Sequence, residues 1–387
     1  MNPIPYARQS IAEEDVAEVV RVLRSPFLTQ GPEIERFEDA VKAAVGAAHA
    51  VAVSNATSAL YLACRALDVG PGDVVWTTPN SFVASANCAR SCGADVDFVD
   101  VDPATYQIDP AAFAAKLEAA ANDGRVPKAA VVVHFAGTPC DLAPLADAAR
   151  RYGVALVEDA SHAIGATYRG TRVGDSAYSD MTVFSFHPVK IVTTGEGGMV
   201  VTNRQDLAER LATLRTHGIT RDPARMTREP DGPWYYEQLE LSGNYRMTDV
   251  QAALGAAQMR RLPAFLTRRA HLAARYAELL AGVDCTLPVL PQDRTSAWHL
   301  YAIGVDPARR RAVFERLRAH GILVNVHYIP IHLQPDFARL GFRRGDFPRA
   351  ESYYARTISL PMFAELTDAE QDRVAFELRG ALARAAA

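Results

Sequence analysis

Two side chains in the middle of the chain, Lys190 and Asp159, could together do chemistry on amines and carbonyl compounds. Lys190 lies in S-F-H-P-V-K-I-V-T-T-G-E-G-G (185–198), after the β-branched and aromatic run T-V-F-S-F (182–186). Such a run predicts a buried strand, and Pro188 ends it. A lysine on the turn that follows is partly desolvated, which favours the neutral, nucleophilic amine. Taken alone, however, this pattern is more typical of a surface lysine in a glycine-rich loop.

Asp159 ends the stretch V-A-L-V-E-D (154–159), which predicts an apolar strand. Open parallel sheets place ligand-binding groups at the carboxyl ends of their strands. Lys190 follows 31 residues later, which leaves room for one further strand. An enzyme that uses pyridoxal phosphate (PLP) needs both groups: a lysine that bonds to the aldehyde, and a carboxylate that keeps the pyridine nitrogen protonated. Without the lysine, Asp159 could equally be a helix N-cap.

A third stretch, V-A-V-S-N-A-T-S-A-L (51–60), leads from a predicted strand into a predicted helix. The free amide groups at a helix N-terminus bind phosphate, and this one begins at Ala56 with the hydroxyl groups of Thr57 and Ser58 beside it. By itself the pattern is more typical of simple capping. The three stretches together predict a PLP site.

These stretches resemble the PLP-dependent sugar aminotransferases of the DegT/DnrJ/EryC/StrS family. The resemblance covers nearly the whole chain, and its most specific motif is F-H-P-V-K-I-V-T-T-G-E-G-G (186–198). The other motifs are F-L-T-Q-G-P (27–32), S-N-A-T-S-A-L (54–60) and T-T-P-N-S-F-V-A-S-A-N (77–87). They are most similar to the 4-aminotransferases of pseudaminic acid biosynthesis. The resemblance implies amino transfer from L-glutamate to C4 of a UDP-linked 4-keto-6-deoxy-N-acetylhexosamine, which forms UDP-4-amino-4,6-dideoxy-N-acetyl-β-L-altrosamine.

The resemblance also implies roles for residues around PLP. Phe82 would stack on the pyridine ring, although an ordinary core position is equally compatible with the sequence alone. His162 would contact the ring hydroxyl or the opposite ring face, as a catalytic residue beside Lys190 and Asp159. Ser185 would bind the phosphate. Asn244 would complete the phosphate site of the partner subunit in a homodimer with shared active sites; without the family, an Asx turn before the next helix is the better interpretation.

Four residues are candidates for binding substrate: Tyr6, Thr29, His327 and Tyr328. Tyr6 could instead be a packing residue. The segment V-H-Y-I-P-I-H (326–332) has two histidines but no carboxylate at a spacing that suits a metal, so no metal site is expected.

The elements that must position these residues alternate between strands and helices over about residues 34–215. Strands are expected at 50–53, 73–77, 96–99, 130–134, 154–158, 182–186 and 198–202. This pattern predicts an α/β protein with a mainly parallel seven-stranded sheet between helices, the fold-type-I PLP-dependent transferase that the family implies. No G-x-G-x-x-G motif opens the chain, which argues against a dinucleotide enzyme.

We expect three parts: an N-terminal segment (1–24) packed with the small domain, a large PLP-binding domain (25–246) and a small α+β domain (247–387). The N-terminal segment contains a predicted helix, Glu13–Leu23, with Ser10 and Glu13 as its capping box. The small domain begins with a helix predicted over Thr248–Leu280 and broken near Pro263. Strands expected at 298–305 and 322–328 flank a basic helix from Pro307 to His320.

The composition excludes several other classes of protein. The 387 residues are 49% hydrophobic and carry a net charge of −4, which gives no electrostatic case for binding nucleic acid or a membrane surface. No basic-apolar leader opens the sequence, and the five cysteines form no C-x-x-C pair. We therefore expect a reduced, cytoplasmic protein.

Two alternatives to the pseudaminic reaction stay open. One is an aminotransferase for another 3- or 4-keto nucleotide sugar, because the motifs do not fix which carbon is aminated. The other is a non-catalytic PLP-fold protein, against which the intact set of Lys190, Asp159 and phosphate-site residues argues. PLP-dependent deoxygenases and dehydratases of the family have histidine in place of the lysine, so Lys190 argues against them.

Overall fold

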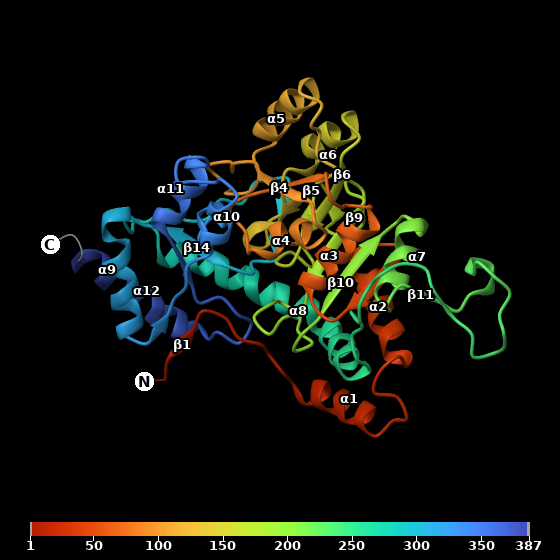
Figure 1. Cartoon of the computed structure of the whole chain (residues 1–387). Helices are drawn as coiled ribbons and strands as arrows, with labels where there is room; N and C mark the ends of the chain where they lie inside the picture. The colour runs from red at the N-terminus through yellow and green to blue at the C-terminus, as the bar shows by residue number, and fades with distance from the viewer. Residues whose placement is uncertain (1, 385–387) are drawn as a thin grey trace.

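A seven-stranded sheet forms the centre of the structure, a computed structural model that describes residues 2–384 (Figure 1). In spatial order its strands are β2 (His49–Val53), β10 (Gly198–Thr202), β9 (Met181–Ser185), β6 (Ala155–Asp159), β5 (Ala129–Val133), β3 (Val74–Thr77) and β4 (Asp95–Phe98). The last five are mutually parallel, and β10 runs antiparallel to both of its neighbours. The prediction of seven strands in a mainly parallel sheet is confirmed, with each strand end within one residue of its expected place.

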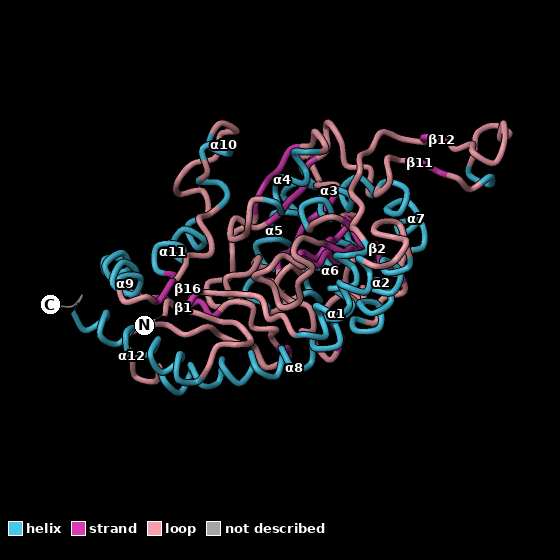
Figure 2. Tube along the Cα trace, turned by 90° about the horizontal axis from the view of Figure 1, so that it is seen from below, coloured by secondary structure: helices cyan, strands magenta, loops and turns pink. Residues whose placement is uncertain are grey.

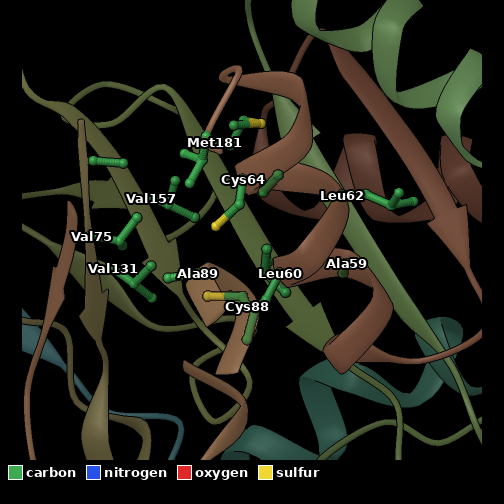
Figure 3. Close-up of a cluster of buried hydrophobic side chains, with 14 of the residues drawn as sticks. Ala59, Leu60, Leu62, Cys64, Val75, Cys88, Ala89, Val131, Val157 and Met181 are labelled. Atoms are coloured by element: carbon green, nitrogen blue, oxygen red, sulfur yellow. The ribbon is translucent and has the colours of Figure 1, made fainter. Parts of the chain in front are cut away.

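Helices cover both faces of this sheet because its strands are apolar on both sides. On one face pack α3 (Ala56–Ala66), α4 (Ala84–Ser91) and α7 (Gln205–Leu214). Figure 3 shows this core, in which Leu60 and Cys64 of α3 lie near Val157 and Met181 of the sheet. On the other face pack α2 (Pro32–Val45), α5 (Pro110–Asn122), α6 (Leu142–Arg151) and α8 (Asp249–Leu279).

The alternation of side chains along the strands decides which polar groups meet. Val157 packs toward α3 and α4, so Asp159, two residues later in β6, points to the same face. Asp159 is in register with Val183 of β9, and Ser185 is two residues beyond Val183. Asp159 and Ser185 therefore end neighbouring strands on one face of the sheet, beside α3 and α4.

The C-terminal part of the chain has its own apolar core. Its elements are β14 (Tyr301–Gly304), α9 (Pro307–Ala319), β15 (Ile322–Leu323), α11 (Pro348–Arg356), β16 (Thr357–Leu360) and α12 (Asp368–Arg384). The strands β14 and β16 pair antiparallel. The N-terminal strand β1 (Ile4–Pro5) pairs parallel with β15, which joins the N-terminal segment to the C-terminal part of the chain (Figure 2). The boundaries expected at residues 24 and 246 stay predictions.

A long arm extends from the body of the molecule between α7 and α8 (Figures 1 and 2). It contains β11 (Ile219–Thr220) and β12 (Glu237–Gln238), which pair antiparallel. Glu237 secures the loop between them, because its carboxylate accepts hydrogen bonds from the backbone amide (2.7 Å) and hydroxyl (2.9 Å) of Thr227. The remaining elements are α1 (Glu13–Leu23), β7 (Thr167–Tyr168), β8 (Thr171–Arg172), β13 (Arg294–Thr295) and α10 (Pro335–Ala338). Over residues 2–384 no helix is both long and apolar enough to cross a membrane.

Three local predictions are wrong. Helix α1 begins at Glu13 as expected, but Ser10 does not cap it: Asp15 accepts from the Ala12 amide at 2.9 Å. Helix α8 continues through Pro263 without a break, because its packing against α1 and α2 outweighs one missing hydrogen bond. The two strands expected at 298–305 and 322–328 are shorter, with only Tyr301–Gly304 and Ile322–Leu323 in ladders.

Candidate active site

A cavity of about 800 Å³ opens where β6, β9 and the N-terminus of α3 meet the C-terminal part of the chain. Ten of the residues predicted from the sequence line it: Tyr6, Ala56, Thr57, Phe82, Asp159, His162, Ser185, Lys190, His327 and Tyr328. Thr29 and Asn244 do not line it. The cavity therefore joins side chains from distant parts of the sequence, from Tyr6 to Tyr328.

Lys190 lies on the turn after β9, and its backbone amide donates to the His187 carbonyl oxygen at 2.8 Å. Among the described residues its ammonium makes no salt bridge. Burial lowers the pKa of Lys190 to about 8, although the nearby Asp159 carboxylate acts in the opposite direction. A substantial fraction of this amine is therefore neutral and nucleophilic near pH 8.

Asp159 is held in place through both carboxylate oxygens. Oδ2 accepts from the Ser85 hydroxyl on α4 at 2.7 Å, and Oδ1 accepts from the Ser161 hydroxyl at 2.6 Å. Ser85 in turn lies 2.7 Å from the Ser81 hydroxyl. These hydroxyl groups fix the position of the carboxyl group at the end of β6.

The N-terminus of α3 forms the opposite wall of the cavity. Asn55 caps the helix by accepting from the Ser58 amide at 2.8 Å, and the segment from Asn55 to Ser58 lines the cavity. Gly198 of β10 lies directly against this end, because a Cβ at that position would be only 2.4 Å from the carbonyl carbon of Asn55. Free amide groups and hydroxyl groups suit an anion such as phosphate.

Aromatic and imidazole rings form the wall beside Lys190. The Tyr328 hydroxyl lies 3.1 Å from Nε2 of His162, and Tyr6 contacts His327 with ring centroids 5.2 Å apart. Burial and the charge of Lys190 hold the pKa of His162 well below its ordinary value. The same two causes lower the pKa of His327 to about 4. Both imidazoles are therefore uncharged at neutral pH.

The sequence profile of the DegT/DnrJ/EryC1/StrS aminotransferase family matches residues 9–379. The chain belongs to this family.

Relatives along its full length support this assignment. The chain is 38% identical over 378 residues to the spore coat polysaccharide biosynthesis protein SpsC of Bacillus subtilis, covering 96% of this chain and 95% of SpsC. Among solved structures it resembles Helicobacter pylori PseC, an aminotransferase involved in the biosynthesis of pseudoaminic acid, with a TM-score of 0.90, 30% identity and coverage of 99% and 100%. It also resembles the PLP form of the sugar aminotransferase Spr1654 from Streptococcus pneumoniae, with a TM-score of 0.89, 28% identity and 99% coverage of each chain.

As a member of the DegT/DnrJ/EryC1/StrS family, the chain is a sugar aminotransferase that uses PLP. The residues of the cavity fit this cofactor: an amine for the aldehyde, a fixed carboxylate for the ring nitrogen and a helix N-terminus for the phosphate. In addition, Nδ1 of His162 is buried and has no hydrogen-bond partner among the described residues. This atom can bond to a group that occupies the cavity.

Of three further predicted residues, Phe82 lines the cavity, whereas Thr29 and Asn244 lie outside it. Phe82 lies at the cavity wall with 60% of its surface exposed, so it is not an ordinary core residue. Thr29 is exposed and bridges to Thr248 at the start of α8. Asn244 is exposed near the base of the arm, and its side-chain oxygen accepts from the Arg246 amide at 3.3 Å, an Asx turn.

Several residues that line the cavity, or that hold a lining residue in place as Ser85 holds Asp159, were not predicted from the sequence. Ser85 and Asn55 lie within family-like motifs, but no local signal distinguishes them from neighbouring polar residues. Asn325 lines the cavity beside His327, with its side-chain nitrogen 3.4 Å from Nε2 of that ring. Nothing in its sequence context marks it, because the contact depends on how the C-terminal part packs against the sheet.

Proposed function

We propose that this enzyme transfers an amino group from L-glutamate to C4 of a UDP-linked 4-keto-6-deoxy-N-acetylhexosamine. The observation that carries the amino transfer is the desolvated amine of Lys190 in one cavity with the fixed carboxylate of Asp159. The likeness of its motifs to those of the pseudaminic acid 4-aminotransferases supports the sugar, as does its overall similarity to PseC.

PLP, when bound, accepts the electrons released at the α-carbon of the amino donor. Lys190 would hold the aldehyde and Asp159 the ring nitrogen, while Phe82 and His162 hold the ring. Ser185 and the α3 N-terminus at Ala56 and Thr57 would hold the phosphate. The neutral amine of Lys190, near pH 8, is the group able to remove the proton from the donor's α-carbon.

We assign the sugar to the side of the cavity that is lined by Tyr6, His327 and Tyr328. This wall combines ring faces with polar atoms, which suits a sugar that presents both apolar faces and hydroxyl groups. His327 is fixed by the Ser359 hydroxyl, 2.8 Å from Nδ1, so its other ring nitrogen can face a ligand. Thr29 would contact substrate only from another subunit, because it lies outside the cavity of its own chain.

A homodimer with shared active sites is part of this proposal. Asn244 is exposed and bridges to Thr216 at the base of the arm, from where it would reach a partner's phosphate site. Large apolar side chains are exposed on the segment before α2 (Phe27 and Leu28) and on the arm (Trp234 and Leu241). Such exposed apolar groups are available to an interface between subunits.

We also place the enzyme in the cytoplasm. All five cysteines are free, as expected in a reducing compartment. The nucleotide-sugar acceptor and the glutamate donor are small, charged and soluble, so no membrane partner is needed.

The test is to offer purified enzyme and L-glutamate a panel of 3- and 4-keto nucleotide sugars and to identify each aminated product by NMR. Amination at C4 of the UDP-linked 4-keto-6-deoxy-N-acetylhexosamine, with the highest kcat/KM, supports the proposal. A higher kcat/KM for another keto sugar would show that the enzyme is an aminotransferase with a different substrate. Similarity to SpsC favours this second candidate function, an aminotransferase for another keto nucleotide sugar. An absorbance band of bound PLP without turnover on any sugar would indicate a non-catalytic protein.

A further inference from the structure

Three cysteines meet where α3 packs against α4. Cys64 of α3 and Cys88 of α4 belong to the same apolar core (Figure 3). Cys92, which directly follows the last residue of α4, packs against that core. The Cys64 thiol is hydrogen-bonded to the sulfur atoms of both Cys88 and Cys92. The Cys92 sulfur also lies 4.0 Å from the carbonyl oxygen of Tyr61, one turn before Cys64. One thiol of α3 therefore lies beside two thiols from the other helix.

The three thiols differ in their access to solvent. Cys64 and Cys88 are buried, whereas Cys92 is partly exposed. Cys88 also has a partner of its own, because its thiol donates to the Ser85 carbonyl oxygen at 3.3 Å. A small oxidant in solution would therefore reach Cys92 first, and Cys64 is the buried thiol behind it.

The surroundings of Cys92 favour its thiolate, which is the reactive form of a cysteine. The hydrogen bond from the Cys64 thiol lowers the pKa of Cys92, and the charge of Arg65 acts in the same direction, while burial opposes both. Arg65 follows Cys64 on α3 and also pairs with Glu240 at 3.3 Å, so only part of its charge acts on Cys92. The hydrogen bond between the two thiols is therefore the larger of the two favourable effects.

We propose that Cys92 and Cys64 form a peroxide-sensitive pair, and that their disulfide ties α4 to α3 and weakens the binding of PLP. All five cysteines are free in the structure, which represents the reduced state. Neither Cys92 nor Cys64 lines the cavity, so this modification site is separate from the active site. The proposal does not depend on which sugar is aminated.

The oxidation takes two steps and consumes one peroxide. In the first step the Cys92 thiolate attacks a peroxide oxygen: an S–O bond forms, the O–O bond breaks, and the departing oxygen takes up the proton that Cys92 lost. In the second step Cys64 attacks the sulfur of the Cys92 sulfenic acid: the S–S bond forms, the S–O bond breaks, and hydroxide leaves with the Cys64 proton as water. The two sulfur atoms together lose two electrons, and the peroxide gains them.

The first step prepares Cys64 for the second. Hydrogen bonds with Cys88 and Cys92 and burial hold the pKa of Cys64 well above its ordinary value. The Cys92 thiolate, which favours the proton on Cys64, is consumed when its sulfur is oxidised. Cys64 then loses its proton more readily, at the moment when a sulfenic acid lies beside it.

The two helices that the disulfide joins both support the cofactor site. The segment from Asn55 to Ser58 at the start of α3 lines the cavity, and Ser85 of α4 donates to Asp159 at 2.7 Å. A covalent S–S bond is much shorter than the contact between two hydrogen-bonded thiols, so the sulfur atoms must approach each other. A shift of α4 with Cys92 lengthens the hydrogen bond between Ser85 and Asp159. PLP should therefore bind more weakly to the oxidised protein.

The test is to treat the full chain with hydrogen peroxide and to map its thiols by peptide mass spectrometry without reduction. We expect a peptide pair linked through Cys64 and Cys92. Cys285 is the internal reference, because it is also partly exposed but burial and Asp284 raise its pKa to about 11. Absence of the linked pair, or oxidation of Cys92 no faster than that of Cys285, would overturn the proposal.

Variants separate the two steps. In Cys64→Ser the sulfenic acid of Cys92 has no thiol to react with, so the diketone reagent dimedone should label Cys92. Cys88→Ser is the matched control, since it removes the neighbouring thiol but should still form the bond between Cys64 and Cys92. A disulfide between Cys64 and Cys88 instead would contradict the assignment of Cys92. The mapping of the wild-type chain decides the question even if the buried Cys64→Ser variant does not fold.

Equilibrium dialysis measures the effect on the cofactor. The affinity for PLP should fall severalfold in peroxide and return after reduction with dithiothreitol. Cys92→Ser should keep its affinity in peroxide, which excludes damage at other residues as the cause. A disulfide that forms without a change in PLP affinity would overturn the link to the cofactor site. None of these readouts uses a sugar substrate, so failure here is distinct from failure of the proposed function.

Discussion

The hydroxyl group of Tyr328 lies 3.1 Å from Nε2 of His162, and this contact joins the C-terminal part of the chain to the loop after β6. His162 is buried and Tyr328 is half-buried, so water cannot readily replace either partner. The contact leaves Nδ1 as the free atom of the His162 ring. The orientation of the His162 ring therefore depends on a residue from the C-terminal part of the chain.

Tyr328→Phe should lower kcat/KM by up to about tenfold, because a typical hydrogen bond contributes about 0.5–1.5 kcal/mol net. The affinity for PLP, measured by equilibrium dialysis, should fall by a similar factor. Tyr354→Phe is the matched control, since Tyr354 stacks under Arg310 outside the cavity. An unchanged PLP affinity in Tyr328→Phe would show that the hydroxyl does not orient His162.

The amine of Lys190 in the PLP-free protein should react with an acylating reagent with a half-maximal rate near pH 8. Burial disfavours the charged ammonium, so the proton leaves at lower pH than from an ordinary lysine near 10.4. Below pH 8 the rate should fall tenfold per unit. Peptide mass spectrometry gives the rate for each lysine, with exposed Lys128 as the internal reference. Asp159→Asn should move the Lys190 midpoint lower still, because the carboxylate opposes deprotonation.

Asp159→Asn should lower turnover by orders of magnitude while PLP binding weakens less. The amide keeps the shape of the side chain but cannot hold the pyridine nitrogen protonated. Turnover is measured with glutamate and the best keto sugar, and PLP binding by absorbance. Asp147→Asn, on the exposed side of α6, is the control. Near-normal turnover in Asp159→Asn would remove this residue from the mechanism.

Gly198→Ala should destabilise the protein by about 1–3 kcal/mol and weaken PLP binding, because the methyl group would push β10 away from the α3 N-terminus. Gly380→Ala is the control in α12, where an added Cβ meets no atom within 4 Å. In the interior of that helix alanine should stabilise by up to about 1 kcal/mol. Urea unfolding of both variants measures the change in the free energy of unfolding, which should be negative for Gly198→Ala and positive for Gly380→Ala. Equal stability of Gly198→Ala and the wild type would show that the strand can move without cost.

Mixed dimers test whether Asn244 acts in trans. Lys190→Ala and Asn244→Ala subunits should each be inactive or weak alone. Their heterodimer should contain one site with both defects and one with neither, so activity should recover toward about half of the wild-type value if the sites are independent. Differently tagged subunits allow the heterodimer to be purified and assayed. A verified heterodimer without recovery would show that Asn244 does not complete the partner's site.

The sequence by itself determined the strands of the sheet and the places of Lys190, Asp159 and the helix N-terminus at Ala56. Strands buried on both faces are short apolar runs, and these appear in the sequence without any knowledge of long-range contacts. Asp159 ends such a run and Lys190 lies on the turn after another, so their positions depend mainly on local structure. The helix N-terminus at Ala56 follows from the same local pattern of strand, turn and apolar helix.

Only the tertiary structure decided what surrounds these groups. Ser85 reaches Asp159 across 74 positions because α4 packs over the end of β6. At the start of α1 the carboxylate of Asp15, rather than the side chain of Ser10, makes the capping hydrogen bond. Gln258 and Arg261 of α8 hold this carboxylate in place, because each donates to it at 2.7 Å. The ring of His162 lies against the ring of His299, and Arg269 donates to the His299 carbonyl oxygen, so these contacts join three distant segments. Contacts of this kind depend on how surfaces pack, and no local run of residue types encodes them.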